Sequence, residues 1–85
     1  MLFDGALVPR IFFHLREGEN ILLDDEGVVM DAAAVPEKAL RTARDIVAHD
    51  AREGRINLGC SLEIRDEAGV AVHTLRFEDA VEIRR

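Results

Sequence analysis

The chain has 85 residues, of which 48% are hydrophobic and 33% are charged, and its net charge is -6 at pH 7. This size and balance fit one small globular domain with a thin core and exclude an intrinsically disordered chain. The acidic balance argues against nucleic acid as a partner, because phosphate backbones repel it. Since no apolar run approaches the roughly 20 residues of a membrane span, we expect no membrane association.

Cysteine content and the N-terminal residues indicate the compartment. Cys60 is the single cysteine, which excludes an internal disulfide and a cysteine-rich metal cage and fits a reducing cytoplasm. The opening residues MLFDGALVPR have no positive charge ahead of an apolar run, so they do not resemble a signal peptide. We therefore predict a cytoplasmic protein, and the sequence predicts no cofactor.

The first predicted strand follows a proline. Pro9 favours an extended residue before it and cannot donate to a strand ladder, so residues 1–8 are interpreted as a leader outside the fold. Residues 9–83 are predicted to form a single small domain. In residues 10–16, RIFFHLR, side chains alternate between two faces. One face carries Ile11, Phe13 and Leu15, and the other carries Phe12, His14 and Arg16.

Residues 20–30 are predicted to be a hairpin partner of this strand, broken at residues 24–27. Asp24, Asp25 and Glu26 precede Gly27 there, a composition that is typical of a turn. A calcium loop of the EF-hand type needs an oxygen ligand five residues before the glycine, where this chain has Leu22. The sequence therefore favours an acidic surface turn.

One amphipathic helix is predicted from near Val35. Pro36 suits its first turn, where no amide donor is needed, and Gly54 suits the residue just after its end. A start with Asp31 as N-cap is the alternative, but it places Pro36 beyond the first turn. The apolar stripe consists of Ala39, Leu40, Ala43, Ile46, Val47 and Ala51.

Residues 60–77 are predicted to be a second hairpin with its turn at residues 66–69. The second strand of this hairpin is ambiguous, because either a bulge changes the register near His73 or both faces are partly covered. The order β-β-α-β-β predicts an α+β fold. Its simplest packing is an antiparallel sheet of about four strands with the helix on one face.

The sheet face opposite the helix is a predicted interface. Phe12 and His14 lie on it, and Val70 and Val72 are expected to join them. An apolar open face on a small domain favours a second copy or another protein as its cover. Phe12 in particular needs a cover, for which the leader, a neighbouring chain and the folded-back tail are the alternatives.

Two histidines and the cysteine are the candidates for chemistry. His14 is a candidate general base or metal ligand, because histidine is the side chain most used for both roles, and His73 is a candidate partner on a nearby strand. We favour a structural role for His14, with its ring beside Phe12 and a hydrogen bond to the backbone. Cys60 has no base beside it in sequence and is interpreted as a core thiol.

Three stretches together resemble a known family. They are PRIFFHLREGENILLDDEGVVMD, the helix KALRTARDIVAHDAREGR and the hairpin EIRDEAGVAVHTLRFEDAVEI. They are similar to short bacterial proteins that carry the domain of unknown function 6894 (DUF6894), over residues 9–83. The resemblance implies a bacterial cytoplasmic setting and no catalytic residues. Departures from the usual pattern are Pro36 at the helix start and His73 in place of an aliphatic residue. Family members usually begin with Met before Pro-Arg, where this chain has Val8, which implies that the preceding residues are an extension.

A weaker resemblance is to HicB-type antitoxin domains, which neutralise a small basic toxin. It rests on the order of elements and on Lys38-Ala39-Leu40 in the helix. Three functions follow as hypotheses. The first is a non-enzymatic protein-binding module that forms a homodimer. The second is an antitoxin-like regulator that binds a basic partner through its acidic first third. The third is a small enzyme or metal-binding protein that uses His14 and His73.

Overall fold

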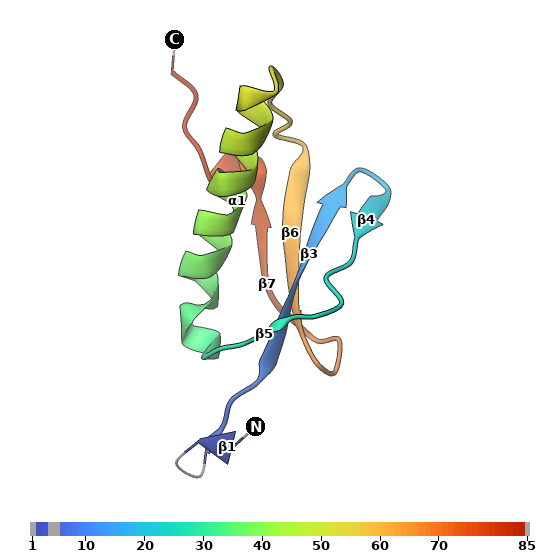
Figure 1. Ribbon diagram of the computed structural model, residues 1–85, viewed down its shortest axis with the longest axis vertical. Helices are drawn as coiled ribbons and strands as arrows, with labels where there is room; N and C mark the ends of the chain where they lie inside the picture. Colours follow the sequence, from blue (N-terminus) through green and yellow to red (C-terminus); the bar gives the residue numbers. More distant parts are fainter. Residues whose placement is uncertain (1, 4–5, 85) are drawn as a thin grey trace.

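The computed structural model describes residues 2–3 and 6–84, and the side chains of residues 8–84. The main sheet is antiparallel, in the order β4-β3-β6-β7, and a short strand β5 also pairs with β3 (Figure 1). The elements in chain order are β3 (Arg10–Glu17), β4 (Asn20–Leu22), β5 (Val28–Val29), α1 (Val35–Arg52), β6 (Cys60–Asp66) and β7 (Ala71–Arg76). The predicted α+β fold and the β-β-α-β-β order of its main elements are confirmed.

A separate two-strand sheet precedes the main one. It pairs β1 (Leu2–Phe3) with β2 (Ala6–Leu7). The interpretation of residues 1–8 as a leader outside the domain of residues 9–83 stays a prediction.

The helix uses both of the start signals that the sequence offers. The side chain of Asp31 accepts a hydrogen bond from the Ala33 amide and caps a short 3-10 helix, η1 (Ala32–Ala34). The α-helix then begins at Val35, with Pro36 in the first turn as predicted. It ends at Arg52, and Gly54 follows with a φ of +87°. Glycine takes this left-handed conformation without the steric cost of a side chain.

The bulge predicted as one alternative for the second hairpin is present. The β6–β7 register shifts between Ile64, which pairs with His73, and Arg65, which pairs with Ala71. Val72 is therefore the extra residue on β7. The shift keeps His73 on the same face as Ile64, and thus on the side of the sheet that faces α1.

The core lies between α1 and the sheet. Phe77, in the 3-10 helix η2 (Phe77–Asp79), is the largest fully buried side chain, and its burial contributes roughly 2–3 kcal/mol. Alanines at the helix contact allow close approach to the sheet. The buried hydrophobic residues are Ile11, Val35, Ala39, Ala43, Cys60, Leu62, Ile64, Phe77 and Ala80. Among the residues described, no helix is long and apolar enough to cross a membrane.

Candidate functional site

His14 and Asp24 join the acidic turn to the middle of β3. The backbone N–H of Asp24 donates to Nδ1 of His14 at 3.0 Å. In return, Oδ2 of the Asp24 carboxylate accepts the backbone N–H of Phe13 at 3.1 Å. Its Oδ1 accepts the backbone N–H groups of Glu26 at 3.2 Å and Gly27 at 3.1 Å. One aspartate thus organises its own turn and fastens it to a neighbouring strand.

This arrangement fills a gap in the strand ladder. The outer edge of β3 pairs with β4 through Leu15 and with β5 through Ile11, and Phe13 lies between these two pairings. A carboxylate oxygen takes the place of the missing strand carbonyl at Phe13. Although burial alone raises the pKa of Asp24, the hydrogen bonds from Gly27, Phe13 and Glu26 and the charge of His14 outweigh it and lower the pKa below its usual value.

The same turn covers Phe12. Gly27 has a φ of +67°, and a Cβ built on it would lie 2.8 Å from the Phe12 ring. The backbone of the turn therefore lies directly against that ring. Phe12 is half-buried, and the cover differs from the leader, the neighbouring chain and the tail that the sequence suggested. The two ring planes of Phe12 and His14 are 12° from parallel, with centroids 6.3 Å apart.

The hydrogen bond to His14 limits its chemistry. A neutral imidazole has one nitrogen that accepts and one that donates. Because Nδ1 accepts from the Asp24 amide, the proton of the neutral ring lies on Nε2. A general base or a metal ligand needs a free lone pair on a ring nitrogen, and in this tautomer the single lone pair is already used. This geometry therefore supports the structural role that the sequence favoured for His14.

His14 and His73 do not share a site. His14 pairs across the sheet with Glu63, on the face away from α1, whereas His73 pairs with Ile64 on the face toward α1. Strand β6 also separates the two strands that carry them. The hypothesis that they face each other is wrong, because the two residues occupy opposite faces of one sheet. In residues 8–84 no three His, Cys, Asp or Glu side chains gather in a metal-binding cluster.

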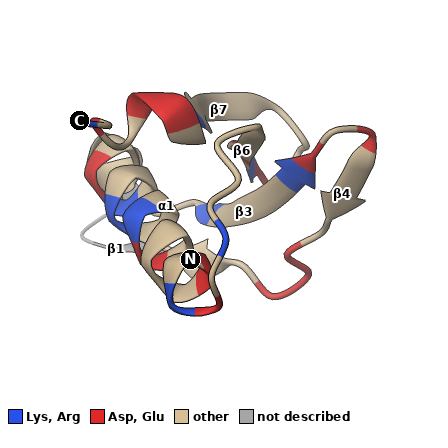
Figure 2. Ribbon diagram, turned by 90° about the horizontal axis from the view of Figure 1, so that it is seen from above, with Lys and Arg blue, Asp and Glu red and all other residues tan. Residues whose placement is uncertain are grey.

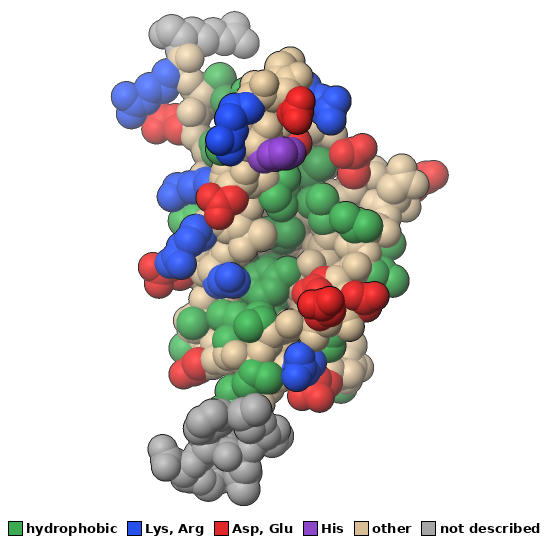
Figure 3. Space-filling view, in the orientation of Figure 1, with side chains coloured by type: hydrophobic (Ala, Val, Ile, Leu, Met, Phe, Trp, Pro, Cys, Tyr) green, Lys and Arg blue, Asp and Glu red, His purple; other side chains and the backbone are tan. Residues whose placement is uncertain are grey.

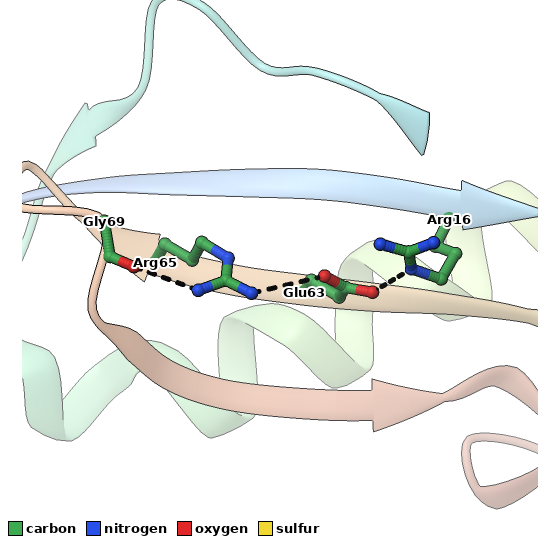
Figure 4. Close-up of polar contacts among 4 residues, drawn as sticks. All are labelled: Arg16, Glu63, Arg65 and Gly69. Atoms are coloured by element: carbon green, nitrogen blue, oxygen red, sulfur yellow. Dashed lines mark hydrogen bonds and ion pairs between the residues drawn. The ribbon is translucent and has the colours of Figure 1, made fainter. Parts of the chain in front are cut away.

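Ion pairs lie at the centre of the open face of the sheet, where the sequence suggested an apolar surface. Glu63 forms ion pairs with Arg16 on β3 and with Arg65, whose Nη1 also donates to the carbonyl of Gly69 at 2.9 Å (Figure 4). The hydrogen bond from Arg16 is the main reason that the pKa of Glu63 is lowered. These pairs tie β3, β6 and the turn of the hairpin together.

Val70 and Val72 are the other two residues of the predicted interface. Val70 directly precedes β7, and Val72 is the second residue of that strand. Val70 is 59% exposed and Val72 is 36% exposed. They are separated from Phe12 by β6. The four residues therefore lie in two separate regions. Phe12 and His14 lie beneath the acidic turn of residues 24–27, and Val70 and Val72 lie in the β6–β7 hairpin. Their role as an interface stays a prediction.

Cys60 is buried and unreactive in character. Its Sγ lies 3.6 Å from Oε2 of Glu17. Burial, the contact with Glu17 and the charge of Asp50 raise the pKa of the thiol. Because the thiolate is the nucleophile, a raised pKa disfavours catalysis. The geometry supports the interpretation of Cys60 as a core thiol.

Sequence reasoning missed an exposed apolar segment inside an acidic run. Residues 17–37 contain no lysine or arginine. Acidic residues lie in the turn before β4 and in the loop after it (Figure 2). The same run holds half of the eight exposed large hydrophobic side chains of the described residues. The seven acids are Glu17, Glu19, Asp24, Asp25, Glu26, Asp31 and Glu37. The four hydrophobic residues are Ile21, Leu22, Leu23 and Val28. A charge count over a window that begins after Arg16 finds the run.

Comparison with known proteins gives one match. The model of the family described as "Domain of unknown function (DUF6894)" matches residues 10–78. No curated protein and no solved structure matches the chain. The likeness to HicB-type antitoxin domains therefore stays a prediction.

Proposed function

The chain belongs to the DUF6894 family of domains of unknown function, and we propose that it is a non-enzymatic protein-binding module of the bacterial cytoplasm. The observation that carries this proposal is the exposure of four large hydrophobic side chains within residues 21–28. Single exposed apolar side chains are ordinary, but four of them within eight residues of an acidic run favour a binding surface.

The absence of catalysis is part of the proposal. His14 uses its acceptor nitrogen for the Asp24 amide, and Cys60 is buried beside Glu17. Both residues have structural contacts that account for their presence. This supports a binding function over the hypothesis of a histidine-dependent enzyme or metal-binding protein.

Self-association as a homodimer is the first form of this function. Val70 and Val72 are two residues apart and both are exposed, and a second copy would remove both from water. The centre of the open face is less suited to self-association, because Glu63 forms ion pairs there and the turn of residues 24–27 covers Phe12. We therefore place the dimer contact at Val70 and Val72. A small domain gains burial in this way.

A regulator that binds a basic partner, like an antitoxin, is the second form. The observation in its favour is the charge of residues 17–37, which include seven acids and no base. Opposite charges steer association and favour correct partners. We therefore expect the partner to be a small basic protein.

Native mass spectrometry of the protein, purified gently from its own host, tests the proposal. A homodimer that V72D converts to a monomer supports self-association through the hairpin. A co-purified basic protein supports the regulator. A bare monomer that retains a metal or small molecule would overturn the proposal and return attention to His14.

A further inference from the structure

The helix covers only part of the sheet. Neighbouring strands lie about 4.8 Å apart, and a helix with its side chains is about 10 Å across, so one helix covers about two strands. In this protein α1 packs on β6 and β7. Figure 2 shows β4 at the end of the sheet away from α1. The helix-facing side of the sheet therefore extends past α1 over β3 and β4.

The side chains on that half of the sheet are apolar. Leu22 pairs with Leu15, so it lies on the same face, toward α1. Phe13 and Leu15 pack against the core and are half-buried, while Leu22 is 70% exposed. Phe13, Leu15 and Leu22 are called the β3–β4 strip below. Hydrophobic side chains line the seam between α1 and the strands beside it in Figure 3.

One flank of α1 borders this strip. On the other flank, Nε of Arg44 donates to the carbonyl of Ala80 at 2.8 Å, and the C-terminal segment lies on the side of α1 away from β4 (Figure 1). The residues three and four apart on the opposite flank are Thr42, Ile46 and His49. Thr42 and Ile46 are half-buried and His49 is exposed. A second helix over the strip would pack beside this flank.

The acidic residues near the β3–β4 strip favour a positively charged partner. Glu19 lies in the turn before β4, and Asp25 and Glu26 lie in the loop after it, all three exposed. Arg10 is close to this loop, but its Nη1 donates to the carbonyl of Glu26 at 2.8 Å, which leaves the carboxylates of the acids for a partner. A helix with lysine or arginine beside its apolar face complements them.

The sheet edges favour a helix over an added strand. Strand β4 has three residues and is followed by the loop that Asp24 holds, and β7 carries the bulge. Short edge strands and bulges oppose the addition of another strand. A helix that lies in an apolar groove uses side-chain contacts and does not need a long free edge.

We infer that the β3–β4 strip binds an amphipathic, basic helix of a partner protein. The apolar face of that helix lies on Phe13, Leu15 and Leu22, and its Lys or Arg residues face Glu19, Asp25 and Glu26. The helix completes a two-layer structure in which two helices cover the sheet. This inference rests on the proposed protein-binding function, and it adds the site and the chemistry of the partner.

A designed peptide tests the inference. The probe has about 15 residues, near the length at which isolated helices become marginally stable, with leucines spaced three and four apart and lysines beside them. A second peptide has glutamate in place of every lysine. Titration of the ¹⁵N-labelled full chain should shift backbone amide signals in β3 and β4. The lysine peptide should bind at least about tenfold more tightly than the glutamate peptide, with the difference shrinking at high salt.

Matched variants locate the site. L22D should weaken binding of the lysine peptide at least about tenfold, because a carboxylate then lies in the apolar contact. I83D is the control, since Ile83 is 58% exposed outside the strip, and it should bind like the unmodified protein. L22S repeats the test without added charge. Both variants at Leu22 should keep the melting temperature, because this side chain is mostly exposed.

Three results would overturn the inference: no binding of the lysine peptide, shifts centred on Val70 and Val72, or equal loss of binding in L22D and I83D. Native mass spectrometry then separates this failure from that of the proposed function. A natural partner that co-purifies but leaves the amides of β3 and β4 unchanged would preserve the binding function and refute the site. Recovery of neither partner nor dimer would count against both.

Discussion

The two acidic turns of this protein have nearly the same sequence and different structural roles. Residues 24–27 are Asp-Asp-Glu-Gly and residues 66–69 are Asp-Glu-Ala-Gly, and both glycines have positive φ angles. In the second turn the carboxylate of Asp66 accepts the amides of Ala68 and Val70 at 2.9 and 3.0 Å. The contacts of Asp66 are local, and they close a hairpin whose strands are already neighbours. The tertiary contact of this turn comes from a different residue, because Oε1 of Glu67 accepts the backbone N–H of Arg10 at 3.2 Å.

In the first turn the aspartate itself makes the long-range contact. The carboxylate of Asp24 accepts the amide of Phe13, eleven residues away, and Gly27 lies against Phe12. Within the part of the chain that the structure describes, no atom outside the immediate chain neighbours lies within 4 Å of a Cβ built on Gly69. The comparison shows that the turn motif determines how the chain bends locally. Whether its aspartate also accepts a hydrogen bond from a distant amide depends on which strand lies beside the turn.

Replacement of the two glycines by alanine should give the largest difference. At both positions an L-residue with positive φ costs about 1–2 kcal/mol. At Gly27 the new Cβ would also lie 2.8 Å from the Phe12 ring and 2.9 Å from the carbonyl oxygen of Ile11, which adds an overpacking cost of about 1–3 kcal/mol. We expect G27A to lower the free energy of unfolding by about 3 kcal/mol and G69A by about half of that.

Urea unfolding followed by far-UV circular dichroism measures both values. F12A in combination with G27A is the control, because a smaller side chain at position 12 should relieve part of the added cost. Equal destabilisation by G27A and G69A would show that the turn does not press on Phe12.

Replacement of the two aspartates separates them next. D24A removes the acceptor for the amides of Phe13, Glu26 and Gly27, and the half-buried amide of Phe13 loses a charge-assisted hydrogen bond. We expect a loss of about 2–3 kcal/mol. D66A should cost about 1 kcal/mol, since water reaches the exposed amides of Ala68 and Val70.

Hydrogen exchange at the Phe13 amide reports the contact directly. The exchange should accelerate in D24A and remain unchanged in D66A. An unchanged rate in D24A would mean that the carboxylate does not protect this amide in solution.

The sequence predicts most of the fold because local signals and periodicity agree. The alternation in residues 10–16, the proline at the helix start and Gly54 after its end each identify an element that the structure contains. These signals depend on a few adjacent residues. The order of the elements then leaves few ways to arrange an antiparallel sheet with one helix.

The surfaces are less predictable, because they depend on contacts between distant residues. The alternation in β3 placed Phe12 on the open face, but nothing in that strand indicates that residue 27 covers it. The ion pairs of Glu63 likewise require the register between β3 and β6. The apolar strip beside α1 depends on which strands the helix covers, and the sequence of the helix does not specify that choice.

Acid should reduce the difference between the two turns. The pKa of Asp24 is lowered in the folded state, so its ionisation contributes stability that is fully present well above the ordinary value of 3.8. That contribution is lost as the pH falls through the lowered folded pKa. We expect the free energy of unfolding of the unmodified protein to exceed that of D24N at pH 6, and the difference to shrink below about pH 4.

Urea unfolding of both proteins from pH 6 to well below about pH 4 measures the difference. D66N is the control for acid effects that all turns share. If D24N and the unmodified protein lost stability in parallel over the whole range, the carboxylate of Asp24 would have the same affinity for protons in both states, and the three amides would not be acting on its ionised form.

The smallest expected effect concerns the histidine beneath the first turn. H14Q removes a ring that lies beside Phe12 and an acceptor for the amide of Asp24, and we expect it to lower the free energy of unfolding by about 1 kcal/mol. H73Q, on the other face of the sheet, is the control.

Because D24A already loosens the turn, H14Q should lower the free energy of unfolding less in a D24A background than alone. A double-mutant cycle measures this coupling. Additive losses would mean that the histidine stabilises the strand independently of the turn. Retained binding of the natural partner by H14Q would agree with a structural role, whereas loss of binding at unchanged stability would identify His14 as a contact residue.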